Sequence, residues 1–433
     1  MPSIPSPSQP NGRRYTLFVL TVLSAMNQLD RQLINILIEP IRREFSLSDL
    51  QIGFLVGLVF VTIYSALSIP AAVVAARYSR RNLLFASAAV WGAMTLMCGF
   101  AQSYWHLLLA RFGVGIGEAG GMPPSHSMIS DLYRPHERAT ALSTWAAGIN
   151  GGIFFAFLFG GMIGQLYGWR WALIAAGLLT VILSIVLRLT VREVPRGGTT
   201  QTQSSAPATS VALLRSTLGQ MFRDSTIRNI TIGATLACIV GSASLAWIPS
   251  FLVRSHGMSI ASVGVYLAVL VGVGGAAGTW FSGAASDWLR KRDLRWSMWL
   301  IAAILIVTKP FAFGFFFVEN TTIALTLFTI PAIFGAAYVG TSIAVLHNRI
   351  DGEMRPMASA LFLLIVNFIG FGFGPLLVGA LSDMTTGRWG TDALRYALVI
   401  SQGVAIWGAL HYYIAGRELA RGRWRAGQCV ADV

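Results

Sequence analysis

The sequence predicts an all-α membrane protein in which twelve transmembrane helices form two six-helix bundles. Three observations predict this fold class. The chain of 433 residues is 55% hydrophobic and only 12% charged, about half the charge of a typical soluble protein. Twelve stretches have the length of about 20 apolar residues that a helix needs to cross a bilayer. The basic residues also gather in alternate connections between these stretches.

The twelve expected spans follow one another with mostly short connections. They lie at roughly 15–38, 50–75, 82–102, 105–128, 139–166, 171–188, 227–252, 262–284, 296–318, 321–345, 357–381 and 393–415. The first apolar run exceeds twenty residues, whereas a cleaved secretory signal has an apolar run of about 7–15. We therefore expect the first stretch to be retained as a membrane helix.

The distribution of positive charge predicts the orientation in the membrane. With the N-terminus inside, 23 of the 32 basic residues fall in cytoplasmic segments and six in outer loops. This is a strong positive-inside pattern, so we expect both termini in the cytoplasm and a location in the cell (inner) membrane. The net charge of +14 is then a topology signal that also attracts anionic lipids, and it does not indicate binding of nucleic acid.

A low-complexity stretch divides the chain into two halves of six expected spans each. A weak parallel repeat supports this division, because the turns AVVAARYSRR and GAASDWLRKR align when Ala76 is placed opposite Asp287. The expected parts are a disordered tail at 1–14, a first bundle at 15–196, a flexible cytoplasmic linker at 197–210, a second bundle at 211–416 and a basic cytoplasmic tail at 417–433.

The repeated turns and the spans around them resemble a known family. The turn after the eighth span has the pattern G-x-x-x-D-x-x-[RK], which resembles that of the major facilitator superfamily. The sequences LDRQ at 29–32, RFGVGIGEAGGMPP at 111–124 and SDLYRPHER at 130–138 are similar to those of its spinster branch, whose animal members move lysolipids and sphingosine phosphates. The resemblance implies a transporter and not an enzyme.

The resemblance also implies a charge lock at the cytoplasmic ends of the repeated turns. The gating residues that it indicates are Arg77, Arg80, Asp287 and Arg290. This sequence departs from the family at the first turn, where Ala76 replaces the expected acid. We therefore expect Asp287 to pair with a basic residue on the cytoplasmic face of the second half and to hold that face closed.

Charged residues inside the spans are costly and usually functional. The acids well inside spans are Asp30 and Glu118, and Arg111 lies seven residues before Glu118 on the same face of its helix, about 10 Å away along the axis. Asp30 fits between them, since the first and fourth spans both line the cavity in the family that this chain resembles. We expect Asp30 and Glu118 to carry a coupled proton. The alternative is an ion-pair network that only holds the two spans together.

The remaining polar residues of the spans have less specific roles. Arg31 points about 100° away from Asp30 on a helix, so we expect it to serve a separate partner or an anionic headgroup. Arg31 and Arg111 are candidates for contact with substrate, because a guanidinium binds phosphate or carboxylate in a bidentate manner; snorkelling toward the interface is the alternative. The candidate cavity residues, each of which could instead have a structural role, are Asn27, Asn150, Asn367 and Lys309.

These observations favour a secondary transporter that works by alternating access, coupled to protons, and moves an amphiphilic or organic anion such as a lysolipid. A carrier of small carboxylates or sugar acids and a drug efflux pump are alternatives within the same class. The spans contain no nucleotide-binding, metalloprotease or serine-hydrolase motif, which disfavours a membrane-embedded enzyme, and two six-helix halves disfavour a channel. We expect no cofactor and no metal, and as partners only the substrate, protons and membrane lipids around a monomer.

Overall fold

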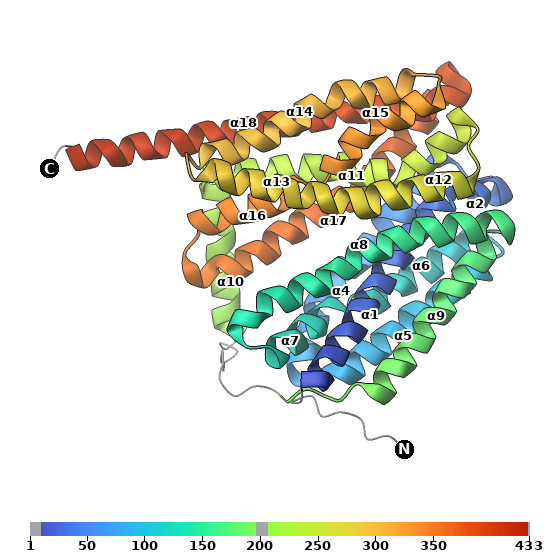
Figure 1. The fold of residues 1–433 in the computed structure, drawn as a ribbon, viewed down its shortest axis with the longest axis horizontal. Coiled ribbons are helices and arrows are strands. Elements are labelled where there is room, and N and C mark those ends of the chain that lie inside the picture. The colour runs from blue at the N-terminus through green and yellow to red at the C-terminus, as the bar shows by residue number, and fades with distance from the viewer. Residues whose placement is uncertain (1–9, 196–206, 432–433) are drawn as a thin grey trace. The chain divides into compact units, whose positions relative to one another are not determined.

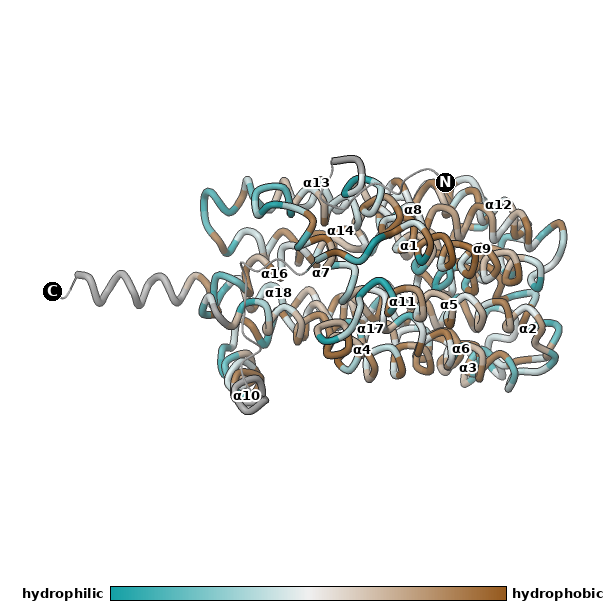
Figure 2. The backbone as a smooth tube through the Cα atoms, turned by 90° about the horizontal axis from the view of Figure 1, so that it is seen from below, coloured by the Kyte–Doolittle hydropathy of each residue, from teal (hydrophilic) through white to brown (hydrophobic). Residues whose placement is uncertain are grey.

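The computed structural model describes residues 10–195 and 207–431, and within these ranges the chain forms helices joined by short connections. Figure 1 shows the helices in chain order, and Figure 2 shows that most of their length is hydrophobic while the connections between them are more hydrophilic. Contacts group the chain into two units. The first contains the chain up to the 196–206 gap and also Leu245–Val273, and the second contains the remainder.

The first half of the chain contributes ten helical segments to the described residues. They are α1 (Pro10–Ile36), α2 (Ile38–Phe45), α3 (Asp49–Gly53), the π-helix η1 (Phe54–Leu58), α4 (Val59–Arg77), α5 (Arg80–Gly99), α6 (Tyr104–Glu118), α7 (Met122–Leu132), α8 (Pro135–Leu166) and α9 (Trp169–Thr190).

The second half begins with a helix that precedes its first expected span. Its segments are α10 (Pro207–Arg223), α11 (Ser225–His256), α12 (Ile260–Leu267), the π-helix η2 (Ala268–Gly274), α13 (Gly275–Arg290), α14 (Arg295–Phe317), α15 (Thr321–Phe334), α16 (Tyr338–Arg349), the 3-10 helix η3 (Gly352–Met354), α17 (Arg355–Trp389), the 3-10 helix η4 (Gly390–Asp392) and α18 (Ala393–Ala431).

Helical structure covers all twelve stretches that the sequence predicts as spans. By length and composition, nine segments of the described residues are long and apolar enough to cross a membrane. The count is lower than twelve for three reasons. α17 and α18 merge into one 66-residue segment, the polar run Asn27–Gln32 reduces the hydropathy of α1, and the fourth stretch is divided into α6 and α7, of 15 and 11 residues.

The structure differs from the expected domain plan at the tail and the linker. Helix α1 already begins at Pro10, inside the tail expected to be disordered, and α10 begins at Pro207, inside the expected linker. Residues 1–9, 196–206 and 432–433 of these segments lie outside the described residues. The region 245–273, expected in the second bundle, groups by contacts with the first unit.

Small residues let the helices that carry the charged groups approach closely. Gly148 and Gly152 of α8 face the backbone carbonyls of Thr21 and Ala25 on α1. On α6, a Cβ atom at Gly117 would lie 2.5 Å from a backbone nitrogen of α5. This close backbone packing, common between membrane helices, holds α1 against α8 and α6 against α5.

Candidate functional site

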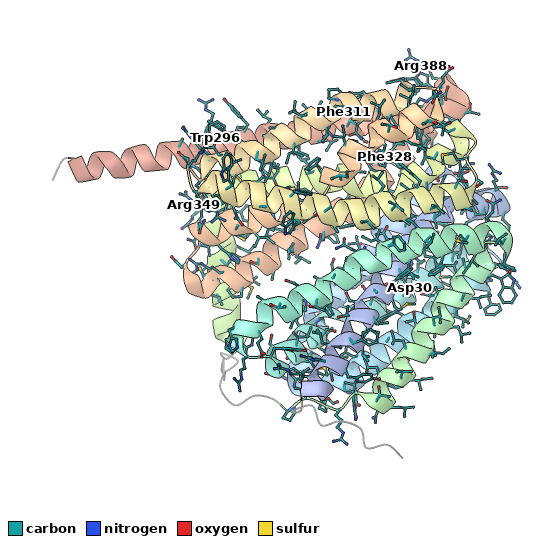
Figure 3. The ribbon with its side chains drawn as sticks, viewed as in Figure 1. Asp30, Trp296, Phe311, Phe328, Arg349 and Arg388 are labelled. Carbon is teal, nitrogen blue, oxygen red and sulfur yellow. The ribbon has the colours of Figure 1, made fainter. Side chains whose placement is uncertain are left out.

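The four charged residues of the first and fourth expected spans belong to one buried cluster. Asp30 and Arg31 lie on α1, and Arg111 and Glu118 lie on α6. Asp30 is 0% exposed, Arg111 2% and Glu118 1%, and Figure 3 labels Asp30 among the helices of the first unit. Charged groups are buried in this way only when partners compensate the loss of water.

Arg31 and Glu118 form the ion pair of the cluster. The Nε atom of Arg31 donates a hydrogen bond to Glu118 Oε2 over 2.6 Å. The Arg31 guanidinium also lies over two aromatic rings of α4, 4.4 Å from the centroid of Tyr64 and 4.8 Å from that of Phe60. These cation–π contacts stabilise the guanidinium beside the carboxylate. The Arg31 side chain keeps 26% exposure while that of Glu118 has none.

The Asp30 carboxylate is held by a neutral hydroxyl, whereas the backbone carbonyl of Asp30 contacts a guanidinium. The Thr95 hydroxyl of α5 donates to Asp30 Oδ2 over 3.1 Å. Arg111 Nη1 donates to the backbone carbonyl of Asp30 over 3.5 Å, and the Arg111 guanidinium lies 5.5 Å from the centroid of the Phe60 ring. Within the part of the chain that the structure describes, no salt bridge joins Arg111 to the Asp30 carboxylate.

The cluster contains buried polar atoms that lack hydrogen-bond partners among the described residues. They are Asp30 Oδ1, Glu118 Oε1, Arg111 Nε and Trp91 Nε1, although the Trp91 side chain lies close to the Asp30 carboxylate and the Asn27 side chain lies close to that of Glu118. Such groups are rare in folded proteins, because an unmet buried donor or acceptor costs about 1–3 kcal/mol. Two of the four are carboxylate oxygens, each of which can receive a proton. The arrangement therefore combines protonatable oxygens with two guanidinium groups that can respond to a change in charge.

The sequence predicted which charged residues of the first unit gather, but not how they pair. Arg31 was expected to serve a partner other than Asp30 or an anionic headgroup, and the sequence did not identify that partner: in the structure its long side chain turns from α1 toward α6 and binds Glu118. The sequence analysis also missed the contributions of α4 and α5, namely Phe60, Tyr64 and Thr95. A signal for the aromatic pair exists, because rings four residues apart share a helix face, and the two rings stack at 5.8 Å.

The other candidate cavity residues differ in their surroundings, and of these Asn27 lies near the cluster, because its side chain interacts with Glu118. Asn27 and Asn150 are partly buried, and Asn367 is exposed. Lys309 on α14 is 8% exposed, and its Nζ donates to Gln402 Oε1 on α18 over 2.9 Å. Lys309 thus satisfies one donor inside the second unit and does not snorkel toward an interface.

The expected gating residues divide between a buried and an exposed arrangement. Arg80 is 1% exposed and donates to Asp131, to Ser127 Oγ at 2.8 Å and to the Val194 carbonyl at 2.6 Å. Asp287 of α13 contacts Arg290 on the same helix at 3.5 Å, and its side chain is 75% exposed. Arg77 is exposed at the end of α4.

An acid that the repeat did not indicate caps the helix after the first repeated turn. Glu193, in the segment that follows α9, accepts hydrogen bonds from the Ser79 hydroxyl and from the backbone amides of Arg80 and Arg81 at the start of α5. Burial works to raise the pKa of Glu193, but these hydrogen bonds and the Arg80 charge hold that pKa below its usual value. Glu193 thereby supplies negative charge at the N-terminus of α5, beside the turn in which Ala76 replaces the acid that the family resemblance led us to expect.

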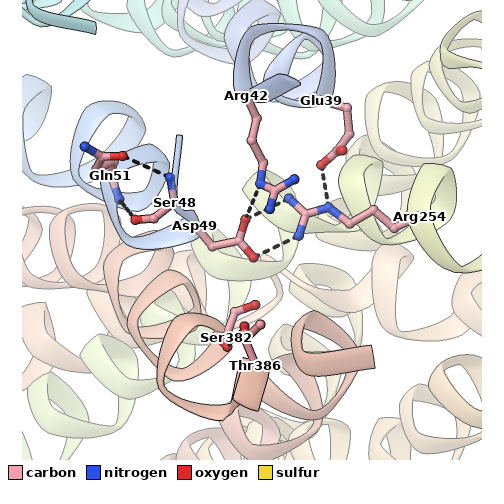
Figure 4. A network of polar contacts seen from close by, with 8 residues as sticks. All are labelled: Glu39, Arg42, Ser48, Asp49, Gln51, Arg254, Ser382 and Thr386. Carbon is pink, nitrogen blue, oxygen red and sulfur yellow. Dashed lines mark hydrogen bonds and ion pairs between the residues drawn. The ribbon is translucent and has the colours of Figure 1, made fainter. Parts of the chain in front are cut away.

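A second charged network lies at the ends of α2, α3 and α11, all in the first unit (Figure 4). Arg254 donates to Glu39 Oε1 over 2.6 Å and to both oxygens of Asp49 over 2.8 Å. Arg42 also pairs with Asp49 at 3.1 Å. The sequence analysis counted Arg42 and Arg254 only as outer-loop charges and did not connect them with these acids.

The comparisons with known proteins agree with this architecture. The sequence model of the Major Facilitator Superfamily matches residues 20–375. The chain belongs to the Major Facilitator Superfamily. This transporter is 31% identical to an MFS-type efflux pump of Mycolicibacterium smegmatis over 93% of its own length and 92% of that protein's. It is 25% identical to the human protein spinster homolog 1, covering 90% of this chain and 78% of that protein.

A solved structure places the transporter within the superfamily. A bacterial homolog of the human lysosomal transporter spinster, crystallised in an inward-facing and unoccupied conformation, superposes with a TM-score of 0.87 at 28% identity, covering 95% of this chain and 98% of that one. The transporter is thus a spinster-like member of the superfamily, a multi-pass integral membrane protein and a secondary transporter, not an enzyme. The resemblance that the sequence indicated is confirmed.

Proposed function

We propose that this protein is a proton-coupled secondary transporter that moves an amphiphilic organic anion, such as a lysolipid, by alternating access. The observation that carries the proposal is the buried cluster of α1 and α6, in which two carboxylates and two guanidinium groups are gathered and two carboxylate oxygens lack partners. A carboxylate in an apolar span is costly unless it is paired or protonated.

The proposed coupling depends on competition for Arg31. In the pair, Glu118 is the anion that Arg31 binds. A proton on Glu118 would remove that negative charge and release the guanidinium, which can then bind the phosphate or carboxylate of the cargo. Arg31 is suited to this exchange because it retains 26% exposure while its partner is fully buried. Phe60 and Tyr64 would hold the guanidinium in place during the exchange.

Asp30 and Arg111 act together in the second part of the proposal. Asp30 would be a further proton acceptor through its unpartnered Oδ1 atom, and Arg111 would orient α1 through its contact with the Asp30 carbonyl. Two carboxylates in one cluster titrate as a coupled pair. The proton would therefore belong to the pair rather than to either residue alone.

The amphiphilic cargo is favoured by the spinster homologs among the relatives. A small sugar acid is the alternative, since the chain is 26% identical to a probable L-galactonate transporter of Escherichia coli over 93% of its length. Drug efflux is a second alternative, because the relative at 31% identity is named an efflux pump. Thermal stabilisation of the purified transporter by lysophospholipids, sphingoid phosphates and small organic acids separates these cargoes.

Two variants in the same experiment test whether Arg31 binds the anionic group of the cargo. Arg31→Gln should abolish stabilisation by the true cargo, because it removes the charge that binds the anion, whereas Arg42→Gln in the other network should preserve it. Stabilisation by sugar acids and not by lysophospholipids would overturn the amphiphilic cargo. Equal stabilisation of wild type and Arg31→Gln would overturn Arg31 as the anion contact.

We also propose twelve membrane crossings of a monomer in the inner membrane, with both termini in the cytoplasm. The positive-inside distribution supports this topology. Single cysteines at Ser204 and Thr386, in a chain whose own cysteines are replaced, test it with an impermeant label. Thr386→Cys should react from outside the cell and Ser204→Cys should not; the reverse pattern would overturn the orientation.

The cytoplasmic gate is proposed to involve Asp287 and Arg290 in the second half, with Arg77 and Arg80 at the corresponding turn. The exposed Asp287–Arg290 contact leaves Asp287 able to exchange partners. Asp287→Asn should favour opening of the cytoplasmic face, and Ala76→Asp should favour its closure. Spin-label distances across that face measure both effects, and unchanged distances in both variants would contradict the gate.

A further inference from the structure

The second unit contains a pocket that the proposed proton site does not use. It lies where α10, the first turns of α11 and the middle of α17 meet, and its volume is about 270 Å³. The residues that line it include Leu218, Met221, Phe222, Leu236, Ile365 and Ile369. None of the charged residues of the α1–α6 cluster contributes to it.

The pocket wall is apolar even where its side chains carry hydroxyl groups. Thr231 donates its hydroxyl to the carbonyl of Ile227 over 2.9 Å, and Thr235 donates its hydroxyl to the carbonyl of Thr231 over 2.7 Å. Both hydroxyls are therefore satisfied within α11, which leaves the methyl groups to face a ligand. Such a wall offers no free hydroxyl donor to a polar ligand, and it favours a hydrocarbon chain.

One cation lies at this apolar pocket. Among the described residues that line it, Arg228 is the one with a charge, and its Nη1 atom donates to the Phe222 carbonyl at the end of α10 over 3.1 Å. The other hydrogen-bonding nitrogens of the Arg228 guanidinium make no hydrogen bond within the described residues. The nearest acid in sequence is engaged elsewhere, because Asp224 pairs with Arg349 at 2.8 Å (Arg349 is labelled in Figure 3) and caps the backbone amide of Ile227.

Helix α10 has the composition of a helix that lies at a membrane surface. Its apolar residues Leu218, Met221 and Phe222 adjoin the pocket, and Phe222 is 61% exposed. Arg215 and Arg223 are exposed on the same helix. Basic side chains beside an exposed aromatic ring are typical of interfacial helices, which bind anionic lipid surfaces.

We propose that this pocket binds one anionic phospholipid of the surrounding bilayer, with an acyl chain against the apolar wall and its phosphate on Arg228. The ligand is a resident lipid, distinct from the transported cargo. The chemistry of the site requires an apolar body joined to one anionic group. A bilayer supplies that combination beside a membrane-embedded helix, whereas a free phosphate lacks the hydrocarbon and a zwitterionic lipid gains less from the guanidinium.

Native mass spectrometry of the full-length transporter in detergent tests the site with phosphatidylglycerol and phosphatidylcholine of identical acyl chains. Wild type should bind one phosphatidylglycerol more tightly than phosphatidylcholine. Arg228→Gln should lower the affinity for phosphatidylglycerol about tenfold, the expected loss for one hydrogen bond to a charged group, and should leave phosphatidylcholine binding unchanged. Thr235→Phe, which fills the pocket, should weaken the binding of both lipids.

Two controls separate the pocket from general electrostatic attraction and from the proton site. Arg215→Gln removes an equal charge from α10 outside the pocket lining and should leave the tight binding intact. Glu118→Gln should also leave it intact, so failure of the lipid site and failure of the proton site are distinguishable. Equal losses in Arg215→Gln and Arg228→Gln, wild-type affinity in Arg228→Gln, or displacement of the lipid by glycerol 3-phosphate alone would each overturn the proposal.

Discussion

Replacement of Arg254 by alanine tests the charged network at the ends of α2, α3 and α11. Arg254 makes three hydrogen bonds to carboxylates, of 2.6, 2.8 and 2.8 Å. The side chains of Glu39 and Asp49 are only 5% and 4% exposed. Removing Arg254 leaves the buried Glu39 without its cation, whereas Asp49 keeps its pair with Arg42. The loss of one partner from a buried pair costs about 3–5 kcal/mol.

The expected effect is a local opening of the segments that Arg254 joins. Hydrogen exchange of the backbone amides in 38–53 and 245–256, followed by mass spectrometry, should accelerate roughly a hundred- to several-thousand-fold in Arg254→Ala. Arg254→Lys should fall between wild type and Arg254→Ala, because lysine keeps the charge but lacks the planar fork that binds both Asp49 oxygens.

A matched variant sets the scale of this measurement. Arg170 forms an exposed pair with Glu44, in which the two side chains are 36% and 41% exposed. A pair of this kind contributes about 1 kcal/mol or less, so Arg170→Ala should accelerate local exchange by only a few-fold. An acceleration in Arg254→Ala no larger than that in Arg170→Ala would refute the argument from burial.

Three further predictions concern single contacts. The pKa of Glu193 is lower in the folded protein than in the unfolded chain. Its contribution to stability is therefore present above the unfolded pKa of about 4.3 and is lost as pH falls through the folded value. Between pH 5 and pH 3, the melting temperature of wild type should fall more than that of Glu193→Gln. The double variant Lys309→Met with Gln402→Leu replaces a buried polar pair by apolar groups. It should be as stable as wild type and should retain transport. Loss of transport at full stability would give Lys309 a role in transport. Gly117→Ala should lower stability by about 1–3 kcal/mol through overpacking. Gly151→Ala should not lower stability, because its added Cβ has nothing within 4 Å. Equal melting temperatures for these two variants would contradict the close packing of α6.

The helices and the membership of the buried cluster could be predicted because both depend on local composition. A run of about 20 apolar residues is visible in the sequence, and so is an acid such as Asp30 within it. The pairing of Arg31 with Glu118 could not be predicted, because it depends on the reach of one side chain and on the position of α6. The Arg254 network joins residues 215 and 205 positions apart, and no local pattern connects them.

The start of α10 illustrates a second limit. The residues from Pro207 to Ser210 resemble the polar low-complexity stretch before them, so composition assigns them to the linker. The structure makes them the first turn of an amphipathic helix. Helix formation there depends on packing of later residues such as Met221, which is 4% exposed, and tertiary packing supplies most of the stability of such helices.

Gradient-driven accumulation of cargo in proteoliposomes tests the proposed proton coupling most directly. Wild type, Asp30→Asn and Glu118→Gln are compared with and without an imposed pH gradient, and downhill exchange of labelled cargo serves as the control for folding and binding. The account predicts that Glu118→Gln loses accumulation against the gradient but retains downhill exchange, and that Asp30→Asn is impaired in the same direction. Full gradient-driven accumulation in both amide variants would contradict proton coupling through this pair and would leave the cluster as an ion-pair network that holds α1 and α6 together.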